Sequence, residues 1–237
     1  MVQHNEYLTY TLDYITDMET TDAFEQKLFI ATAAVQAWEV KGRQPGLFDI
    51  AAAAGVPASD LYKYFPNVPA VFHFWYESLP QRYRLMVAEL DAYNELTLSE
   101  KLTNMMLTIT DMMEEQLPFV QETFNSMVFK NQSWHPFCKE NEHLLKEIIS
   151  THQGLSRTAQ IVLWDDVYAF LSKEFLHVIK FWMRDTSPDR QKTMALLDTF
   201  NGLVSELMTN RLIDKGTDLA RFFWNEGLIK IPFVSPK

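Results

Sequence analysis

The sequence predicts an all-α protein with a small three-helix domain followed by a larger helical bundle domain of about six helices. Apolar residues make up 47% of the 237 residues, which is enough to build a substantial core. Only seven residues are Gly, and apolar side chains recur at helical spacing, whereas alternating strand patterns are missing. At this length the chain can form one large domain or two smaller ones.

The composition argues against secreted, membrane-spanning and disulfide-stabilised proteins. Cys138 is the single cysteine, so no intrachain disulfide can form. The first twenty residues contain acids but neither Lys nor Arg, unlike a secretory signal, and no apolar run is long enough to span a bilayer. We therefore expect a cytoplasmic protein with no membrane span.

The chain begins with an acidic stretch, residues 1–22, which we interpret as an N-terminal arm or an additional helix. This stretch contains five acidic residues and no basic ones. A first helix is then expected over residues 23–41, because an apolar stripe recurs there at helical spacing. The stripe consists of Phe24, Leu28, Ala31, Val35 and Trp38.

Two short helices joined by a tight turn are expected next, and they complete a helix-turn-helix domain over residues 23–67. The first covers Leu47–Ala54, and Gly55 follows it, as is usual where a helix ends in a left-handed conformation. The second begins near Ala58 and carries Leu61 and Phe65. The second helix of such a pair can lie in the major groove of DNA.

The segment from Gly42 to Phe65 resembles the N-terminal domain of TetR-type transcriptional regulators. The resemblance rests on the order and spacing of Gly42, Ile50–Ala51, Ala54–Gly55–Val56 and Leu61–Phe65. It implies a TetR-like fold, in which a three-helix DNA-binding domain precedes a larger domain for ligand binding and dimerisation. We place that second domain at residues 68–228 and a C-terminal tail at 229–237.

Seven polar or charged residues are candidates for contacting DNA: Lys27, Arg43, Ser59, Asp60, Tyr62, Lys63 and Tyr64. Lys63 can contact a phosphate or a guanine edge, Ser59 and Asp60 can contact bases, and the tyrosines can donate to phosphates. Alternatives stay open for several of them. One of the two tyrosines can face the core, Lys63 can simply be solvated, and Asp60 can stabilise its helix N-terminus.

Three residues depart from the usual TetR pattern at positions where phosphates are normally held. Gly46 and Pro57 stand where hydroxyl residues commonly cap the second and third helices, and Val68 opens the fourth helix where the family usually has a Lys-Glu pair. Residues 23–66 also carry four basic and four acidic side chains, so the domain is neutral. These features support an alternative function, an apolar-ligand or lipid binding protein of TetR fold that has lost DNA recognition.

The helices of the second domain are delimited by capping residues, prolines and apolar periodicity. Thr97-Leu-Ser-Glu100 forms a capping box, Pro118 interrupts or restarts a helix, and Ser187 is an expected N-cap with Pro188 at the first helical position. The expected helices lie near 68–93, 98–117, 119–128, 137–151, 161–182 and 188–212. The resemblance implies a homodimer through the helices near 160–183 and 188–212.

Another part of the second domain carries family information. Phe181–Asp189 resembles the C-terminal domain of one TetR branch, and the pattern Trp-x-x-Asp-x-Ser-Pro-Asp within it is similar to a lipid-binding ubiquinone-biosynthesis accessory protein of TetR-like fold. This similarity makes a lipid-like ligand a candidate. A small apolar ligand is also favoured by the abundance of Met and aromatic residues, because Met adapts to irregular apolar ligands.

The residues expected to line such a ligand site are Met105, Met106, Ile109, Met112, Met113, Phe124, Met127, Trp134, Trp164, Tyr168 and Phe175. The same spacing is also typical of an ordinary helical core. We expect no cofactor, no metal and no enzyme activity. The sequences Glu140–His143 and Glu174–His177 have the spacing of di-iron ligands, but too little chain separates them for the usual intervening helix.

Overall fold

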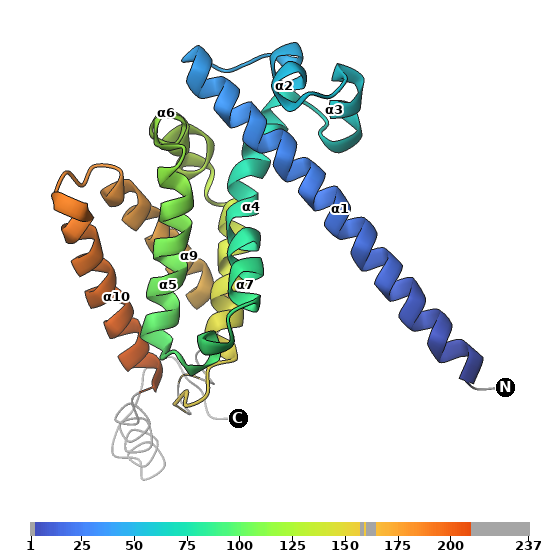
Figure 1. The fold of residues 1–237 in the computed structure, drawn as a ribbon. Coiled ribbons are helices and arrows are strands. Elements are labelled where there is room, and N and C mark those ends of the chain that lie inside the picture. The colour runs from blue at the N-terminus through green and yellow to red at the C-terminus, as the bar shows by residue number, and fades with distance from the viewer. Residues whose placement is uncertain (1–2, 157–158, 160–164, 210–237) are drawn as a thin grey trace, which may run out of the picture. The chain divides into compact units, whose positions relative to one another are not determined.

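The computed structural model describes residues 3–156, 159 and 165–209, and every regular element in these ranges is helical. The all-α fold class is thereby confirmed (Figure 1). The chain divides into two compact units, one formed by residues 1–85 with 111–140 and the other by 86–110 with 141–237. No helix in the described ranges is both long and apolar enough to cross a bilayer.

The first unit holds the helix-turn-helix. Its helices are α1 (Gln3–Lys41), α2 (Leu47–Ala54), α3 (Ala58–Tyr64), most of α4 (Val68–Ala88) and α6 (Leu117–Met127), followed by a short 3-10 turn, η2 (Phe129–Asn131). Helices α2 and α3 pack on each other and on α1 (Figure 1). Residues 3–22, expected as an arm, belong to the same helix as residues 23–41.

Aromatic side chains form the core of the first unit. Phe72, Tyr76 and Phe119 are fully buried, and the Phe119 ring lies 5.6 Å from Tyr76 and 5.3 Å from Trp38. The Trp38 Nε1–H donates to Oε2 of Glu122 at 3.0 Å, which ties α1 to α6. The aromatic start of α4 therefore packs on α1 and α6, because rings of this size cover much apolar surface.

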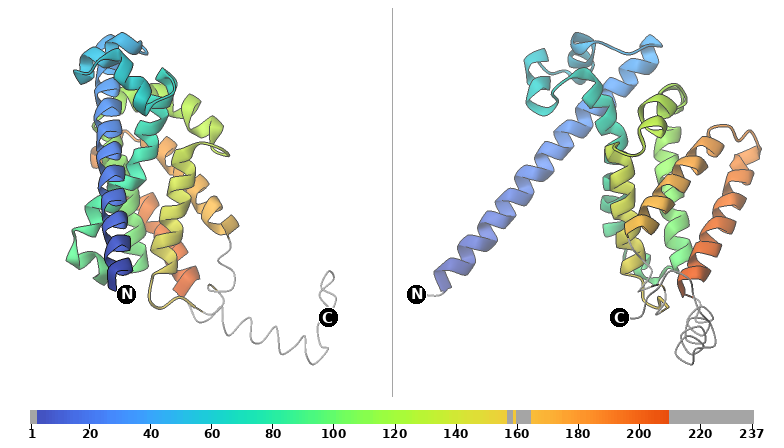
Figure 2. Two further views of the ribbon diagram at one scale, coloured as in Figure 1. Left: turned by 90° about the vertical axis from the view of Figure 1, so that its right-hand side faces the viewer. Right: turned by 180° about the vertical axis from the view of Figure 1, so that it is seen from behind.

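The second unit is a set of packed helices with two 3-10 turns. The elements are η1 (Asp91–Glu95), most of α5 (Leu98–Glu114), most of α7 (Pro136–Ser150), α9 (Asp165–Trp182), η3 (Pro188–Arg190) and α10 (Gln191–Thr209). Helices α9 and α10 form a hairpin (Figure 2). Helix α4 ends at Ala88, and the expected extension to Tyr93 is instead the 3-10 turn η1.

Two expected boundary signals are confirmed. The Thr97 N–H and hydroxyl donate to Glu100 Oε2 at 2.8 and 2.7 Å, and the Glu100 N–H points back to Thr97 Oγ1 at 3.3 Å. Pro118 lies in the first turn of α6, where its missing N–H removes no helical hydrogen bond. The helix therefore restarts at Leu117.

The turn between α9 and α10 is organised by Asp185 more than by Ser187. Asp185 Oδ1 accepts from the Ser187 N–H and hydroxyl at 2.9 and 2.6 Å, and Oδ2 accepts from the Thr193 N–H and hydroxyl at 2.8 and 2.7 Å. These donors hold the pKa of the Asp185 carboxyl well below its usual value. The Arg190 guanidinium lies 4.6 Å from the Trp182 ring centroid. The sequence pattern that suggested a lipid ligand thus has a structural role in this chain.

Candidate functional site

The turn of the helix-turn-helix is a Schellman motif. Gly55 has φ 64°, and its N–H donates to the Ala52 carbonyl at 3.3 Å, while the Val56 N–H donates to the Ala51 carbonyl at 3.0 Å. These two bonds satisfy carbonyls that the end of α2 would otherwise leave unpaired. The expectation that Gly55 ends the helix in a left-handed conformation is confirmed. The motif fixes the direction in which the chain enters α3.

Helix α3 has a buried face and an exposed face. Leu61 is 2% exposed, and the Phe65 ring that follows the helix lies 5.6 Å from Phe74. Tyr62 is 60% exposed, and Tyr64 is partly buried. Of the two tyrosines, Tyr62 is therefore the one with an accessible ring and hydroxyl.

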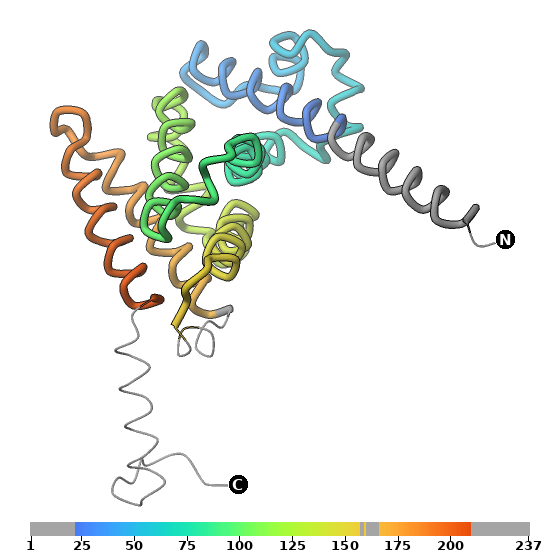
Figure 3. Tube along the Cα trace, turned by 60° about the horizontal axis from the view of Figure 1, so that its bottom comes forward, coloured from blue at the N-terminus to red at the C-terminus, as the bar shows by residue number. Residues whose placement is uncertain are grey.

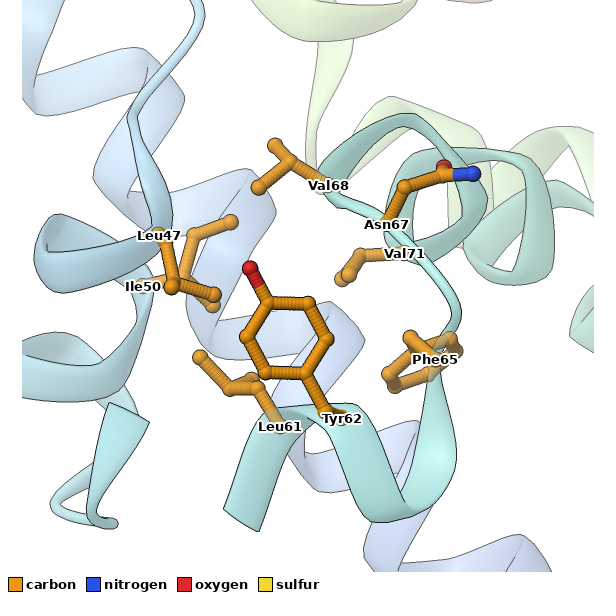
Figure 4. Close-up of a pocket in the computed structure, with 8 residues that line it drawn as sticks. All are labelled: Leu47, Ile50, Leu61, Tyr62, Phe65, Asn67, Val68 and Val71. Atoms are coloured by element: carbon orange, nitrogen blue, oxygen red, sulfur yellow. The ribbon is translucent and has the colours of Figure 1, made fainter. Parts of the chain in front are cut away.

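Tyr62 also borders a small hollow between α2, α3 and the start of α4 (Figure 4). The hollow has about 200 Å³ of empty volume, including space open to solvent, and apart from Asn67 and the Tyr62 hydroxyl its lining is apolar. Leu47 and Ile50 of α2 lie on one side of the Tyr62 ring, and Val71 and Phe65 lie on the other. Its small volume suits packing around Tyr62 better than a ligand.

Most basic side chains of this domain have a partner within it. Lys63 Nζ lies 3.0 Å from Asp60 Oδ1, and Lys41 Nζ lies 2.5 Å from Asp49 Oδ1. Lys27 Nζ lies 5.5 Å from the centroid of the Phe74 ring. These contacts reduce the positive charge that the domain can present to phosphates.

The two remaining polar candidates differ in their surroundings. The Ser59 hydroxyl donates to Asp60 Oδ1 at 3.3 Å, so Asp60 accepts from both Ser59 and Lys63. Within the described part of residues 22–67, Arg43 is the basic side chain without an ion pair or ring contact, and it is exposed. Arg43 is therefore the cation most available to an external anion.

Other groups cap two of the three helices that begin at positions departing from the family pattern. Gly46 has no side chain to cap α2, but its N–H donates to Asp49 Oδ2 at 2.9 Å. This N–H and the Lys41 ammonium, which contributes most, lower the pKa of the Asp49 carboxyl. Pro57 precedes α3 without a side-chain cap, and α4 is capped instead by Asn67, whose Oδ1 accepts the Ala70 N–H at 2.9 Å. The caps serve the fold without adding hydroxyls for a phosphate.

The residues expected to line a ligand site fall in both units. Met105, Met106 and Ile109 of α5 and Tyr168 and Phe175 of α9 are buried and belong to the second unit. The expected residues of the first unit are Met112, Met113 and Phe124, which are buried, Met127, which is partly buried, and Trp134.

Two of the expected ligand residues stand apart. Trp134 is 56% exposed, and its ring lies 6.1 Å from His73 and from His135. Trp164 lies outside the described residues, as do 210–228 of the proposed domain and the tail 229–237.

A pair of histidines in the first unit, of which His135 is fully buried and His73 partly buried, was not anticipated. His73 Nδ1 lies 2.8 Å from His135 Nε2, and the Phe137 N–H donates to His135 Nδ1 at 3.1 Å. Burial lowers the pKa of His135 to about 3 and also lowers the pKa of His73. The two histidines are far apart in the chain, and no local pattern links them, so sequence inspection had no signal for this pair.

The two Glu-x-x-His sequences are not assembled into a metal centre in the part of the chain that the structure describes, where no three His, Cys, Asp or Glu side chains cluster. Glu140 Oε2 accepts from Arg84 Nη1 at 3.1 Å instead, and His143 and His177 are exposed. Helix packing directs these side chains away from a common point.

Comparison with known proteins agrees with this architecture. The TetR transcriptional regulator from Nitrosomonas europaea ATCC 19718 shares 18% identity, with 75% of this chain and 96% of that chain covered and a TM-score of 0.57. The TetR family repressor AlkX from Dietzia sp. strain DQ12-45-1b, implicated in biodegradation of n-alkanes, shares 12% identity, with 78% and 97% covered and a TM-score of 0.54. At these identities the similarity concerns the fold.

A search of curated proteins gave no match. The family model described as tetracyclin repressor-like, C-terminal domain, matches residues 101–223, which is more than half of the chain. This match includes α5, α6, α7, α9 and α10 and the turn built around Asp185. The chain therefore belongs to the TetR family of transcriptional regulators.

Proposed function

We propose that the protein is a ligand-responsive repressor that binds a palindromic DNA operator as a homodimer. The exposed face of α3 carries this proposal: Ser59, Tyr62 and Lys63 face solvent while Leu61 packs inward. A helix presented in this way by a rigid turn can enter the major groove, where it can contact bases and phosphates. Arg43, before α2, adds a cation for the flanking backbone.

Dimerisation is supported by a second apolar stripe on α10. One stripe of this helix, which includes Leu197 and Val204, is buried in the protomer. Another stripe is open to solvent, and its exposed members Leu196, Leu203 and Leu207 recur at helical spacing. A second copy of the hairpin of α9 and α10 would cover this stripe and form a four-helix interface.

Release by a ligand requires two dimer forms with different separations of the recognition helices. Operator half-sites one helical turn apart need separations of about 34–36 Å. A small apolar ligand that binds the form with another separation would shift the dimer away from DNA. The shift is limited by the difference between the ligand's affinities for the two forms.

The test is binding of the purified protein to its own upstream DNA and to a scrambled duplex at two salt concentrations. Tight, selective and salt-sensitive binding is expected from phosphate contacts, and it should weaken in the Lys63→Ala variant. Asn125→Ala, an exposed polar change on α6, is the control. No binding to either duplex at low salt would contradict the proposal.

A second candidate function is an apolar-ligand or lipid binding protein of the same fold without DNA recognition. It is favoured by the internal pairing of Lys63 with Asp60 and of Lys41 with Asp49, which reduces the available positive charge. Mass spectrometry of material that co-purifies with the protein would test it. A bound lipid together with absent DNA binding would support this function over the first.

A further inference from the structure

Asn141 is a fully buried amide without a hydrogen-bond partner. The residue lies on α7 in the second unit and has no exposed surface. Neither its Oδ1 nor its Nδ2 has a partner. Buried amide groups are almost always paired, because an unpaired one loses its bonds to water and gains nothing in return. Asn141 in this state therefore lowers the stability of the fold.

The surroundings of Asn141 along α7 are apolar. Phe137, one turn before it, is fully buried, and Leu144 and Leu145, one turn after it, are 2% and 0% exposed. Residues at this spacing share one face of a helix. The amide thus interrupts an apolar stripe at its centre, where an aliphatic residue would serve packing better. A local rule broken in this way is typical of a functional position.

The neighbouring helix α9 runs in the opposite direction to α7 (Figures 1 and 2). Lys146 Nζ lies 6.0 Å from the Tyr168 ring centroid, which joins the later part of α7 to the early part of α9. Phe175, further along α9, is fully buried in the same unit. Asn141 is therefore a buried residue of the unit that holds several of the side chains expected to bind a ligand.

A second unpaired amide oxygen lies in the same unit. Asn201 of α10 is fully buried, and its Nδ2 donates to Thr103 Oγ1 at 3.0 Å, which joins α10 to α5 (Figure 3). Its Oδ1 has no partner. The described part of the second unit thus contains two buried acceptor atoms, Asn141 Oδ1 and Asn201 Oδ1, and one buried donor group, Asn141 Nδ2, that lack a partner. A pure hydrocarbon would leave all of these atoms unpaired.

We propose that the second unit binds an aliphatic molecule with a neutral hydroxyl head group, and that Asn141 holds this head. The proposal rests on the ligand-binding role proposed above and specifies the chemical class. A hydroxyl donates its proton to Oδ1 and accepts from Nδ2, so one group satisfies both sides of the amide. A carboxylate only accepts, so it would leave Oδ1 unpaired and bring a charge into an apolar region.

The test compares three probes of one chain length: 1-decanol, decane and decanoate. Isothermal titration calorimetry gives the affinities, and thermal unfolding gives the stability of the empty protein. The wild-type protein is expected to bind 1-decanol about tenfold or more tightly than decane or decanoate, since each well-placed hydrogen bond contributes about that factor. Wild-type binding without preference for the alcohol would overturn the proposal.

The variants assign the preference to Asn141. Asn141→Leu, of similar size, should unfold at the same or a higher temperature, lose about tenfold in 1-decanol affinity and keep its affinity for decane. Asn141→Ser retains a donor and acceptor, so it should keep part of the preference even if Asn141→Leu folds poorly. Asn125→Leu, at an exposed position of α6, is the matched control and should change neither affinity.

The remaining outcomes separate this proposal from the proposed regulator. Asn141→Leu could keep the preference for 1-decanol and unfold at a lower temperature than the wild type. That result would show that Asn141 serves packing or holds a buried water, and it would overturn the head-group proposal. Binding of none of the probes by a protein that still binds its operator would overturn the head-group assignment alone. Alcohol binding through Asn141 without DNA binding would overturn the regulator alone.

Discussion

Lys63 Nζ lies 3.0 Å from Oδ1 of Asp60, three residues earlier on α3. The pair places a carboxylate beside the cation proposed to meet a phosphate. Both side chains are solvent-accessible, so water and salt screen their attraction. The pair therefore has little effect on stability and a larger effect on the charge that α3 presents to solvent.

Replacing Asp60 by Asn should strengthen binding to non-specific DNA about three- to tenfold at low salt, because one repulsive charge is removed and Lys63 is released. Lys63→Ala should weaken binding and reduce the slope of log affinity against log salt by about one. Fluorescence anisotropy at several salt concentrations measures both changes. Equal slopes in wild type and Lys63→Ala would remove Lys63 from the phosphate contacts.

Leu203→Glu should convert the proposed dimer to a monomer. Leu203 is 57% exposed at the centre of the open apolar stripe of α10, where a buried carboxylate would lack a partner. We expect the dimer dissociation constant to rise at least about tenfold, as for a central interface residue. Light scattering coupled to size-exclusion chromatography measures it. Ala195→Glu is the control, because it adds the same charge to α10 away from the stripe. Equal dimer dissociation constants for Leu203→Glu and Ala195→Glu would exclude the stripe as the interface.

The histidine pair should make stability depend on pH below neutrality. The folded-state pKa of His135 is about 3, against 6.5 for an unperturbed histidine, so only the unfolded chain takes up the proton between these values. The free energy of unfolding should therefore fall with decreasing pH through this window. The slope is about 1.4 kcal/mol per pH unit for each such proton.

The geometry explains why protonation is opposed. His135 Nδ1 accepts from the Phe137 N–H, so its proton resides on Nε2 and points at His73 Nδ1. Protonating His73 would set two N–H groups against each other. Urea unfolding between pH 7 and pH 4 checks this prediction. The free energy of unfolding of His135→Gln should depend on pH less steeply than that of the wild type. His143→Gln, a change at an exposed site, is the control and should keep the wild-type dependence. Equal slopes in all three proteins would rule out the pair as the cause.

Asp185→Asn should lower the thermal unfolding temperature, because the carboxylate accepts four hydrogen bonds and an amide cannot reproduce all of them. Asp189 in the same turn is exposed and has φ 48°, a region that Asn tolerates well. Asp189→Asn is therefore the matched control and should be neutral. Differential scanning fluorimetry compares them, and equal unfolding temperatures in both variants would contradict the structural role of Asp185.

Several features followed from the sequence alone because their causes are local. Gly55 ends α2 since a left-handed residue is needed there, and the Thr97–Glu100 box starts α5 since both partners lie within one turn. The apolar stripe of residues 23–41 predicted a helix packed on the helix-turn-helix. The family resemblance of Gly42–Phe65 was confirmed through an independent match to the other domain, residues 101–223.

Other features depend on contacts between distant segments, and no short-range pattern predicts them. The sequence left open whether Lys63 contacts DNA or is simply solvated. Its pairing with Asp60 depends on side-chain rotamers, and the pairing of Lys41 with Asp49 depends on how α2 meets α1. The apolar periodicity of the second domain did not reveal that Leu196 and Leu203 of α10 stay exposed while Leu197 is buried. Only packing decides which of two apolar stripes faces inward.

The sequence by itself determined the helical class, the helix-turn-helix and the family, because these depend on periodicity, capping and the spacing of a few small or apolar residues. The tertiary structure alone decided that His73 meets His135 and that Asn141 is buried without a partner. Burial and long-range pairing are properties of the assembled core. A polar residue on an apolar stripe acquires its meaning only when the surrounding helices exclude water from it.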